Sequence, residues 1–405
     1  MPVDLDTLPE RIVPPSAPDK RRWLLVILLC CLLGGSLGVL FWPSDSWRMS
    51  LWFWCCVLVL PSVAGLLLFA LRARAYEQER EYAQSWNQQH TEHERLLITH
   101  GQRAIALLAT SYRTPAGNNQ LARALRSSST PLQPVYLSDV NSTLRASQLT
   151  PAGDSTAEHS YQRRLQLFLQ QLMCGLDSEL QRYGRSTLLN LRIKHNQVLS
   201  DAEILSLWRS CAAEDLAIDQ VRFATQDDGV LWLDEWLDQP EACSLLLSLE
   251  INLFQEPVTE QAESVSALLL AQQPFCEMQK LTPEAWIHRP VPMINEAKSL
   301  QDVLRWGRIG DNEPYFVWQA QIPGDVLCAV SIAMDSAGHS LDIDKCMRLD
   351  DAFGRPASAL GNITIIVASE QAAADVQPQL VMLQDASPQW CVIRPAVQTG
   401  SEIKS

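Results

Sequence analysis

Hydrophobic residues are concentrated first in two uninterrupted runs near the start of the chain. Residues 23–42 and residues 51–71 contain no charged side chain, and each run is long enough to cross a hydrocarbon core of about 30 Å as a helix. A cleaved signal peptide is the alternative for the first run. Its apolar part is too long for one, however, and no small-residue cleavage site precedes the second run. The pattern predicts a two-helix transmembrane hairpin over residues 23–71.

Two features inside the predicted hairpin affect how its helices run and pack. Pro61 lies within the second span, where a missing backbone N–H is expected to kink the helix. Gly34 and Gly38 form a small-xxx-small pair, which lets two helices approach closely. Glycines are also common in such spans without that role, and the sequence leaves both interpretations open.

The segments around the hairpin are polar. Residues 1–22 are rich in proline and mixed charge without periodicity, which predicts a disordered tail, and residues 398–405 predict a second one. Residues 72–101 are charged and favour helix, so they predict a helical stalk. His90, His93 and His100 of the stalk suggest a metal site by their spacing, but a solvated polar surface explains them better.

Beyond the stalk, residues 102–397 alternate between strand-like and helix-like spacing. Strands are expected at 105–109, 187–193, 220–224, 244–254, 264–270, 326–334, 362–367 and 390–393. Helices are expected at 120–126, 163–183, 200–211 and 230–237. Such alternation predicts a layered α/β body with buried sheets.

Charge and cysteine content narrow the function classes. A formal net charge of −14 and a pI near 5.0 argue against nucleic-acid binding. The 11 cysteines are an odd number without a CxxC pair, so no disulfide framework or zinc site is indicated, which fits a reducing compartment. Basic residues flank the hairpin at 20–22, 72 and 74, whereas its loop holds only Arg48. This asymmetry predicts a two-pass protein with both termini in the cytoplasm. The membrane expected for it is a bacterial inner membrane.

The stretch from Arg103 to Leu149 suggests a fold family. A buried strand at Ile105–Ala109 is followed by a turn containing Pro115 and Gly117, a short helix and a proline-rich extended segment. This order resembles the opening of β-ketoacyl synthases, which belong to the thiolase-like fold. The resemblance implies a layered αβαβα body over residues 102–397.

The resemblance also implies where a catalytic cysteine should stand. In that family the nucleophile lies between a strand and a helix whose N-terminus lowers the thiol pKa. The corresponding turn here holds Gln226, Asp227 and Asp228, and a carboxylate caps a helix but cannot form the thioester. Cys211 falls too early, and Cys243 belongs to the next strand.

The other residues that such chemistry needs are missing as well. No His-Gly-Thr-Gly-like turn is present, and His339 is the one histidine beside a suitable glycine, where a surface role is the simpler interpretation. No Gly-rich phosphate loop, Gly-x-Ser-x-Gly elbow or His-Glu-x-x-His motif occurs. We therefore expect no catalytic residue, metal or cofactor.

An acidic cluster that follows the turn is interleaved with two tryptophans. Its carboxylates can do acid–base work only if burial raises a pKa, which the sequence does not show. Trp232 and Trp236 stand four apart on a predicted helix, so they form a stripe that faces either the core or a protein partner. The core is the favoured alternative, and partner binding is the other.

A thiolase-like body without its nucleophile, tied to a membrane, suggests a pseudoenzyme that binds proteins. The arrangement resembles the membrane-associated adaptor proteins of bacterial type VI secretion effectors. That resemblance implies a protein partner in the cytoplasm, such as an effector or a secretion-spike protein, and a possible homodimer paired through a sheet edge. The alternatives are an acyl-transferring or condensing enzyme that uses Cys211 or Cys243, and a structural subunit of an envelope complex.

Overall fold

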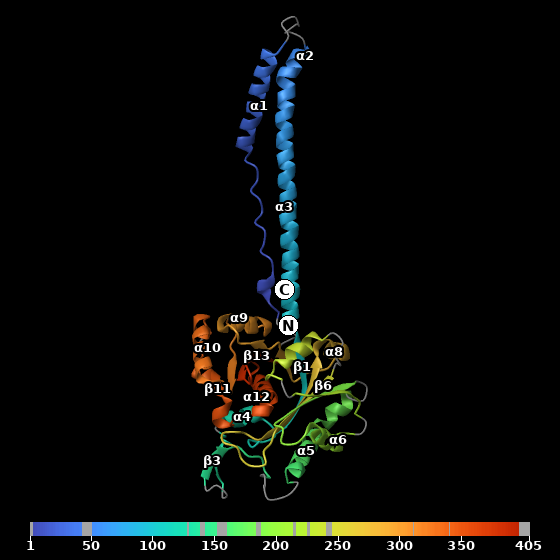
Figure 1. The fold of residues 1–405 in the computed structure, drawn as a ribbon, viewed down its shortest axis with the longest axis vertical. Coiled ribbons are helices and arrows are strands. Elements are labelled where there is room, and N and C mark those ends of the chain that lie inside the picture. The colour runs from blue at the N-terminus through green and yellow to red at the C-terminus, as the bar shows by residue number, and fades with distance from the viewer. Residues whose placement is uncertain are drawn as a thin grey trace. The chain divides into compact units, whose positions relative to one another are not determined.

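The computed structural model describes residues 3–42, 51–127, 129–137, 142–151, 160–183, 188–213, 216–224, 227–239, 245–310, 312–339 and 341–396. It divides into two compact units (Figure 1). Residues 4–98 form the first unit, a helical hairpin with a stalk. Residues 99–405 form the main part of the second unit, the α/β body.

The hairpin consists of two long helical segments. Helix α1 spans Lys20–Leu40. The second segment joins α2 (Leu51–Trp54), a π-helical turn (Cys55–Val59) and α3 (Leu60–Gly101) without a break. Both segments are long and apolar enough to cross a membrane. Thirty residues of α3 follow residue 71, so the helix continues for about 45 Å at 1.5 Å per residue.

Glycines allow the two segments to pack closely. A Cβ added at Gly34 would lie 2.5 Å from Cγ of Pro61, and one added at Gly38 would lie 2.9 Å from Cγ2 of Val57. Both distances are shorter than real Cβ contacts, so the packing of the hairpin requires glycine at these positions. This agrees with the close-approach interpretation of the pair. The distortion expected near Pro61 takes the form of the π-helical turn that precedes it.

The segment before α1 differs from the disordered tail that its composition predicts. Ile12 and Asn87 of α3 exchange two hydrogen bonds, from the Ile12 N–H at 3.0 Å and to the Ile12 carbonyl at 2.8 Å. Arg11 forms an ion pair with Glu94 at 2.9 Å. A polar segment does not order by itself. These contacts hold it against α3, and their partners lie far away in the sequence, so its composition alone does not reveal them.

One mixed sheet with 11 strands organises the body, and it divides into two halves of the same topology. The strands of the N-terminal half are β1 (Ala104–Arg113), β4 (Leu189–His195), β5 (Ile218–Phe223), β6 (Leu245–Asn252) and β7 (Ser264–Gln272). The strands of the C-terminal half are β8 (Ala285–His288), β10 (Phe316–Ala320), β11 (Cys346–Arg348), β12 (Gln379–Gln384) and β13 (Pro388–Pro395), with β9 (Val291–Pro292) paired to β13.

Strand order within the two halves is identical. The N-terminal half runs β5-β4-β6-β7-β1 and the C-terminal half β11-β10-β12-β13-β8, which is third, second, fourth, fifth and first in each. The second, third and fourth strands are parallel, and the fifth is antiparallel to both of its neighbours. The first strands of the halves, β1 and β8, join them as an antiparallel pair.

Helices form three layers with the sheet halves between them. The outer helices of the N-terminal half are α5 (Ser160–Tyr183) and α6 (Asp201–Cys211), and those of the C-terminal half are α9 (Glu296–Trp306) and α10 (Gly324–Ser336). The central helices are α4 (Leu121–Arg126), α7 (Trp232–Asp238) and α12 (Leu360–Asp375). Short helices α8 (Gln273–Gln279) and α11 (Leu349–Ala352) and a separate hairpin of β2 (Gln133–Leu137) and β3 (Ser142–Ala146) complete the described elements.

The core is built around α12, which contacts strands of both halves, including β7 and β12. Its first ten residues are all buried, and the helix is apolar on every side. A helix with that composition is stable only when it is surrounded by protein. The two sheet halves provide this environment, and the resulting order of layers is αβαβα, as the sequence predicts.

Two of the expected strands are wrong. The segment Val326–Met334 belongs to helix α10, in which Val330 and Met334, one helical turn apart, are buried. The segment Asn362–Val367 lies inside α12. Both are short apolar runs, in which periodicity cannot distinguish a buried helix from a buried strand. Tertiary burial overrides the strand preference of their β-branched residues.

Candidate functional site

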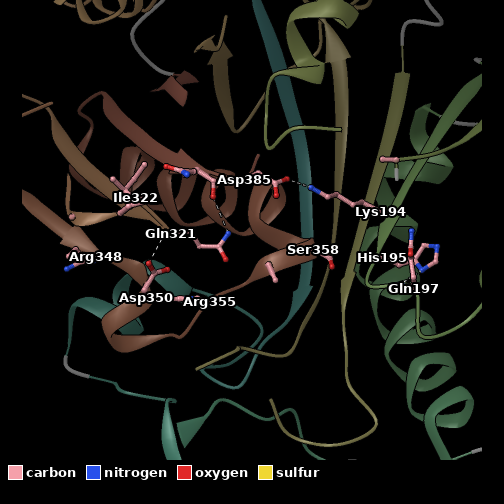
Figure 2. A pocket seen from close by; sticks show the side chains of 15 residues that line it. Lys194, His195, Gln197, Gln321, Ile322, Arg348, Asp350, Arg355, Ser358 and Asp385 are labelled. Carbon is pink, nitrogen blue, oxygen red and sulfur yellow. Dashed lines mark hydrogen bonds and ion pairs between the residues drawn. The ribbon is translucent and has the colours of Figure 1, made fainter. Parts of the chain in front are cut away.

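A cavity of about 720 Å³ opens at the carboxyl ends of strands from both halves of the body. Lys194 and His195 come from the end of β4, Gln321 follows β10, and Asp385 follows β12. Figure 2 shows Lys194 and His195 on one side of the cavity and Gln321, Asp350 and Arg355 on the other. The carboxyl ends of parallel strands are where open α/β sheets bind their ligands.

The turn at which the thiolase-like resemblance places the nucleophile borders this region. Asp227 is almost fully buried and accepts hydrogen bonds from Arg192 Nε at 2.8 Å and from an Arg222 nitrogen at 2.7 Å. Asp228 accepts from the backbone N–H of Ser387 and from the Gln389 side chain at 2.6 Å. Gln226 lies outside the described residues. Both carboxylates are thus fully used as hydrogen-bond acceptors.

The same turn connects the two halves of the body. Asp228 belongs to the N-terminal half, whereas Ser387 lies between β12 and β13 of the C-terminal half. Lys194 Nζ lies 2.5 Å from Asp385 Oδ2, which also accepts the Gly229 N–H at 3.0 Å. These contacts bind β4 and the turn before α7 to the C-terminal half with charged groups.

Beneath the turn lies a buried ion pair. Arg192 of β4 and Glu250 of β6 are joined at 2.9 Å, and their side chains are 3% and 0% exposed. The second Glu250 oxygen accepts the backbone N–H of Asn362 at 2.8 Å, in the first turn of α12. A carboxylate is stabilised there because the helix N-terminus has a partial positive charge. Arg192 also stacks on the Trp232 ring at 4.2 Å.

Cysteines are absent from this cavity in the part of the chain that the structure describes. Cys211 ends α6, and burial raises the pKa of its thiol. Burial also raises the pKa of Cys276 to about 11 and that of Cys391 to about 12. Such thiols are poor nucleophiles because the thiolate is the reactive form. Cys243 lies outside the described residues.

Three histidines that could have taken part in chemistry contact other side chains of the protein. His195 lies 2.8 Å from an Asp201 oxygen through Nε2 and accepts the Gln197 N–H through Nδ1 at 3.1 Å. His339 packs against Tyr315 and lines a different pocket, of about 600 Å³. His100, which belongs to the same unit as the body, lies 2.8 Å from Asp238. Among the described residues, no group of three or more His, Cys, Asp or Glu could hold a metal ion.

The tryptophan pair and the acidic cluster beside it have structural partners. Trp232 and Trp236 are 7% and 5% exposed and belong to the central core, which favours the core alternative over partner binding. Asp234 and Asp238 both bind Arg289, which is 1% exposed. Burial raises the pKa of Asp234. For Asp238 burial acts in the same direction, but the Arg289 guanidinium outweighs it and lowers the pKa.

Sequence reasoning missed the charged residues that define this region. Arg192 and Lys194 alternate with apolar residues in β4, and Glu250 interrupts an apolar run in β6. A charged residue inside an otherwise buried strand is itself a signal, because such a group is retained only with a partner. The partners come from distant segments, so the sequence does not name them.

Comparison with solved structures shows that the architecture of the body is similar to that of ketosynthases. The body is similar to a β-ketoacyl synthase from Burkholderia phymatum, with a TM-score of 0.51 and 11% identity over 72% of this chain and 99% of the synthase. It is also similar to the ketosynthase from module 1 of the bacillaene synthase of Bacillus amyloliquefaciens, with a TM-score of 0.50 and 10% identity over 73% and 76% of the two chains.

The body has a thiolase-like fold. At these identities the likeness concerns the fold alone. No model of a protein family matches the chain, and no curated protein matches its sequence.

Proposed function

We propose that this chain is a membrane-anchored, non-catalytic protein that binds a protein partner in the cytoplasm. The observation that supports this most strongly is the state of the turn before α7. Asp227 and Asp228 stand where the resemblance expects the nucleophile, and both are held by side chains or backbone groups of the body. A thiolase-like body with this turn has kept the fold but has no thiol there to accept an acyl group.

The hairpin unit supports the membrane part of the proposal. Two helical segments are long and apolar enough to span a bilayer. Residues that precede α1 form hydrogen bonds with α3 beyond the second span, as Ile12 does with Asn87. This contact fits a two-pass hairpin with both flanks on one side. The excess of basic residues on those flanks favours the cytoplasmic side of a bacterial inner membrane.

A secreted effector is the partner class that fits the sequence resemblance. Adaptors of type VI secretion hold an effector in the cytoplasm before it is loaded for delivery by the secretion spike. An anchor with a long helical stalk and a body that no longer needs a substrate channel is suited to that task. We therefore propose an effector or a spike protein as the partner.

The test is affinity purification of the full-length protein from membranes of its own host in a mild detergent, followed by mass spectrometry. An unrelated tagged two-span protein, purified in parallel, identifies the background. We expect a stoichiometric soluble partner with effector or spike-protein character. Recovery of acyl carrier protein or acyl-CoA enzymes would contradict the proposal and favour an enzyme. Loss of function after exchange of both spans for unrelated ones, with partner binding intact, would favour a structural subunit.

A further inference from the structure

One end of the helical hairpin carries a cluster of exposed cations, here called the basic collar, which consists of Lys20, Arg21, Arg22, Arg72 and Arg74. Residues 16–22 and 72–76 contain these five cations and a single acid, Asp19. Residues 43–50, which connect the two spans at the other end, contain one acid and one cation. The chain as a whole has a net charge of −14, so the collar is a local exception to its charge.

The packing of the two helical segments brings both parts of the collar to the same end of the hairpin. A Cβ added at Gly65 of α3 would lie 3.2 Å from Cα of Ile27 in α1. Closer to the collar, the ring centroids of Trp23 and Phe69 are 5.7 Å apart. The two segments therefore run antiparallel and side by side (Figure 1). Residues 20–22 directly precede Trp23 and residues 72–74 follow Phe69 within two turns, so the five cations lie close together.

Three of the collar's cations are available to a ligand. Arg22 and Arg72 form ion pairs with exposed carboxylates, at 3.5 Å and 3.8 Å, and exposed pairs of this kind are weak. The side chains of Lys20, Arg21 and Arg74 form no ion pair within 4.0 Å with any residue that the structure describes. Because no carboxylate neutralises these three charges, they favour an anionic ligand.

The surface next to the collar is apolar, and it determines which kind of anion fits. Leu24, Leu25 and Leu71 are each 64% exposed. A soluble phosphate or a nucleotide would leave these leucines in water. A phospholipid covers them with its acyl chains, and its phosphate reaches the cations beside the span. A zwitterionic headgroup adds a cation of its own, which the collar repels, so an anionic headgroup fits best.

We propose that the basic collar binds the phosphate of anionic phospholipids, with Lys20, Arg21 and Arg74 as the contacting residues. The acyl chains of the lipid lie along the exposed leucines of the two spans. The inference rests on the membrane anchoring in the proposed function, but it does not depend on the identity of the protein partner. It gives the anchor a preference for membrane rich in anionic lipid, which an uncharged hairpin lacks.

The experiment uses the full-length protein, purified in a mild detergent and titrated with dioleoylphosphatidylglycerol as the anionic lipid. Dioleoylphosphatidylcholine, which has the same chains, is the zwitterionic comparison, and native mass spectrometry measures how much of each lipid is bound. The neutral variant combines Lys20→Gln, Arg21→Gln and Arg74→Gln. It keeps Arg22 and Arg72, which preserve an excess of positive charge on this side of the hairpin for membrane insertion.

Two further variants serve as controls. The charge-conserving variant exchanges lysine and arginine at the same three positions of the collar. The body variant removes one lysine and two arginines that are exposed in the α/β body, as Arg163→Gln, Arg209→Gln and Lys280→Gln. It therefore has the same net charge as the neutral variant and an intact collar.

We expect the wild-type protein to bind phosphatidylglycerol more tightly than phosphatidylcholine, and rising salt should reduce the difference because it screens exposed charges. The neutral variant should bind phosphatidylglycerol about tenfold or more weakly, whereas both control variants should keep the wild-type affinity.

Equal affinity of the wild-type protein for the two lipids would overturn the inference, and this comparison holds even if the neutral variant does not insert into the membrane. Unchanged phosphatidylglycerol binding by the neutral variant would overturn it as well. Displacement of the lipid by an equal concentration of inorganic phosphate would also contradict it, because the collar would then be a site for free phosphate.

Failure here is distinguishable from failure of the proposed function. If alkaline carbonate releases the wild-type protein from host membranes, the membrane anchoring itself is wrong. If the protein stays in the membrane but binds both lipids equally, only the assignment of the collar is wrong.

Discussion

The two halves of the body share one strand order, but the main helices between their third and fourth strands differ in length and burial. In the C-terminal half this helix is α12, with 16 residues and nearly complete burial. In the N-terminal half it is α7, with 7 residues. In the turn before α7, Asp228 accepts hydrogen bonds from Ser387 of the C-terminal half, whereas Asp227 pairs with Arg192 and Arg222 inside the N-terminal half. The C-terminal half thus has the longer, buried helix, and the N-terminal half has a short helix that follows the turn where the sequence resemblance expects the nucleophile.

A second difference concerns the helix between the second and third strands. In the N-terminal half this is α6, which Ser200 and Glu203 close with a reciprocal capping box. In the C-terminal half it is α10, whose N-cap Pro323 has no side-chain hydrogen bond. Gly324 at the start of α10 lines the cavity. The two helices therefore begin differently, because a capping box closes the start of α6, whereas the start of α10 borders the cavity.

The largest effect should come from breaking the buried pair below the turn. Glu250→Ala removes one of the two carboxylates that pair with the buried Arg192 and leaves the Asn362 N–H without its acceptor, and we expect a loss of about 3–5 kcal/mol of unfolding free energy. Urea unfolding of the full-length protein in detergent, followed by tryptophan fluorescence, measures it. Glu277→Ala on the exposed surface of α8 is the control. An equal loss in both variants would show that the ion pair between Arg192 and Glu250 does not contribute specifically to stability.

A smaller loss of unfolding free energy is expected at Gly229, which follows Asp228 and has a φ of +50°. A Cβ there would lie 2.6 Å from Oε1 of Gln389 and 2.7 Å from Cδ1 of Leu383, both in the C-terminal half. Gly229→Ala should therefore destabilise the body by about 1–3 kcal/mol. Gly338→Ala is the matched control because its φ is +79° but no atom lies within 4 Å of its Cβ. If the two variants melt at the same temperature, strain rather than contact between the halves explains the loss.

His288 lies on β8, which pairs with β1 where the two halves meet, and it should make the free energy of unfolding depend on pH. Burial, together with the charges of Arg308 and Arg394, lowers the pKa of His288 on β8 to about 3. The unfolded chain takes up a proton below about pH 6.5 and the folded chain does not, so stability is full above that pH. It should fall by about 1.4 kcal/mol per pH unit as the pH decreases from there toward 3.

His288→Gln is the variant that isolates this effect. It should flatten the pH dependence of the urea midpoint between pH 7 and pH 5 relative to the wild-type protein. An unchanged slope would mean that other groups cause the dependence.

The smallest effect should come from the cap of α6. Ser200→Ala removes the hydroxyl that accepts the Glu203 N–H, which should cost about 1 kcal/mol. Ser206→Ala, further along the same helix, should cost less because its hydroxyl bonds only within the helix. Thermal unfolding of both variants tests the difference. Equal melting temperatures would show that the capping box does not distinguish α6 from α10.

The sequence predicts the layered fold, and it displays the two carboxylates before α7, because both depend on local patterns. Alternating apolar segments give most of the strands and helices, and Asp227 and Asp228 can be recognised without any knowledge of their contacts. The sequence failed at α10 and α12, where strongly apolar segments favour a strand until the surrounding layers are known.

The candidate site was harder to predict because its residues are brought together only by the fold. Lys194 meets Asp385, which is 191 residues away, and Arg192 meets Glu250 from a neighbouring strand. Arg348 and Arg355 are ordinary surface residues in the sequence. In the folded chain both line the cavity.

The most direct test of the account is the mass of the intact protein after exposure to acyl thioesters. The full-length protein is incubated with acyl-CoA and with acyl-loaded carrier protein, alongside an active β-ketoacyl synthase as the positive control. We predict that the synthase gains one acyl group and that this chain gains none. An acyl adduct on any cysteine of this chain, Cys211 and Cys243 included, would contradict the proposal that it binds partners without catalysing acyl transfer.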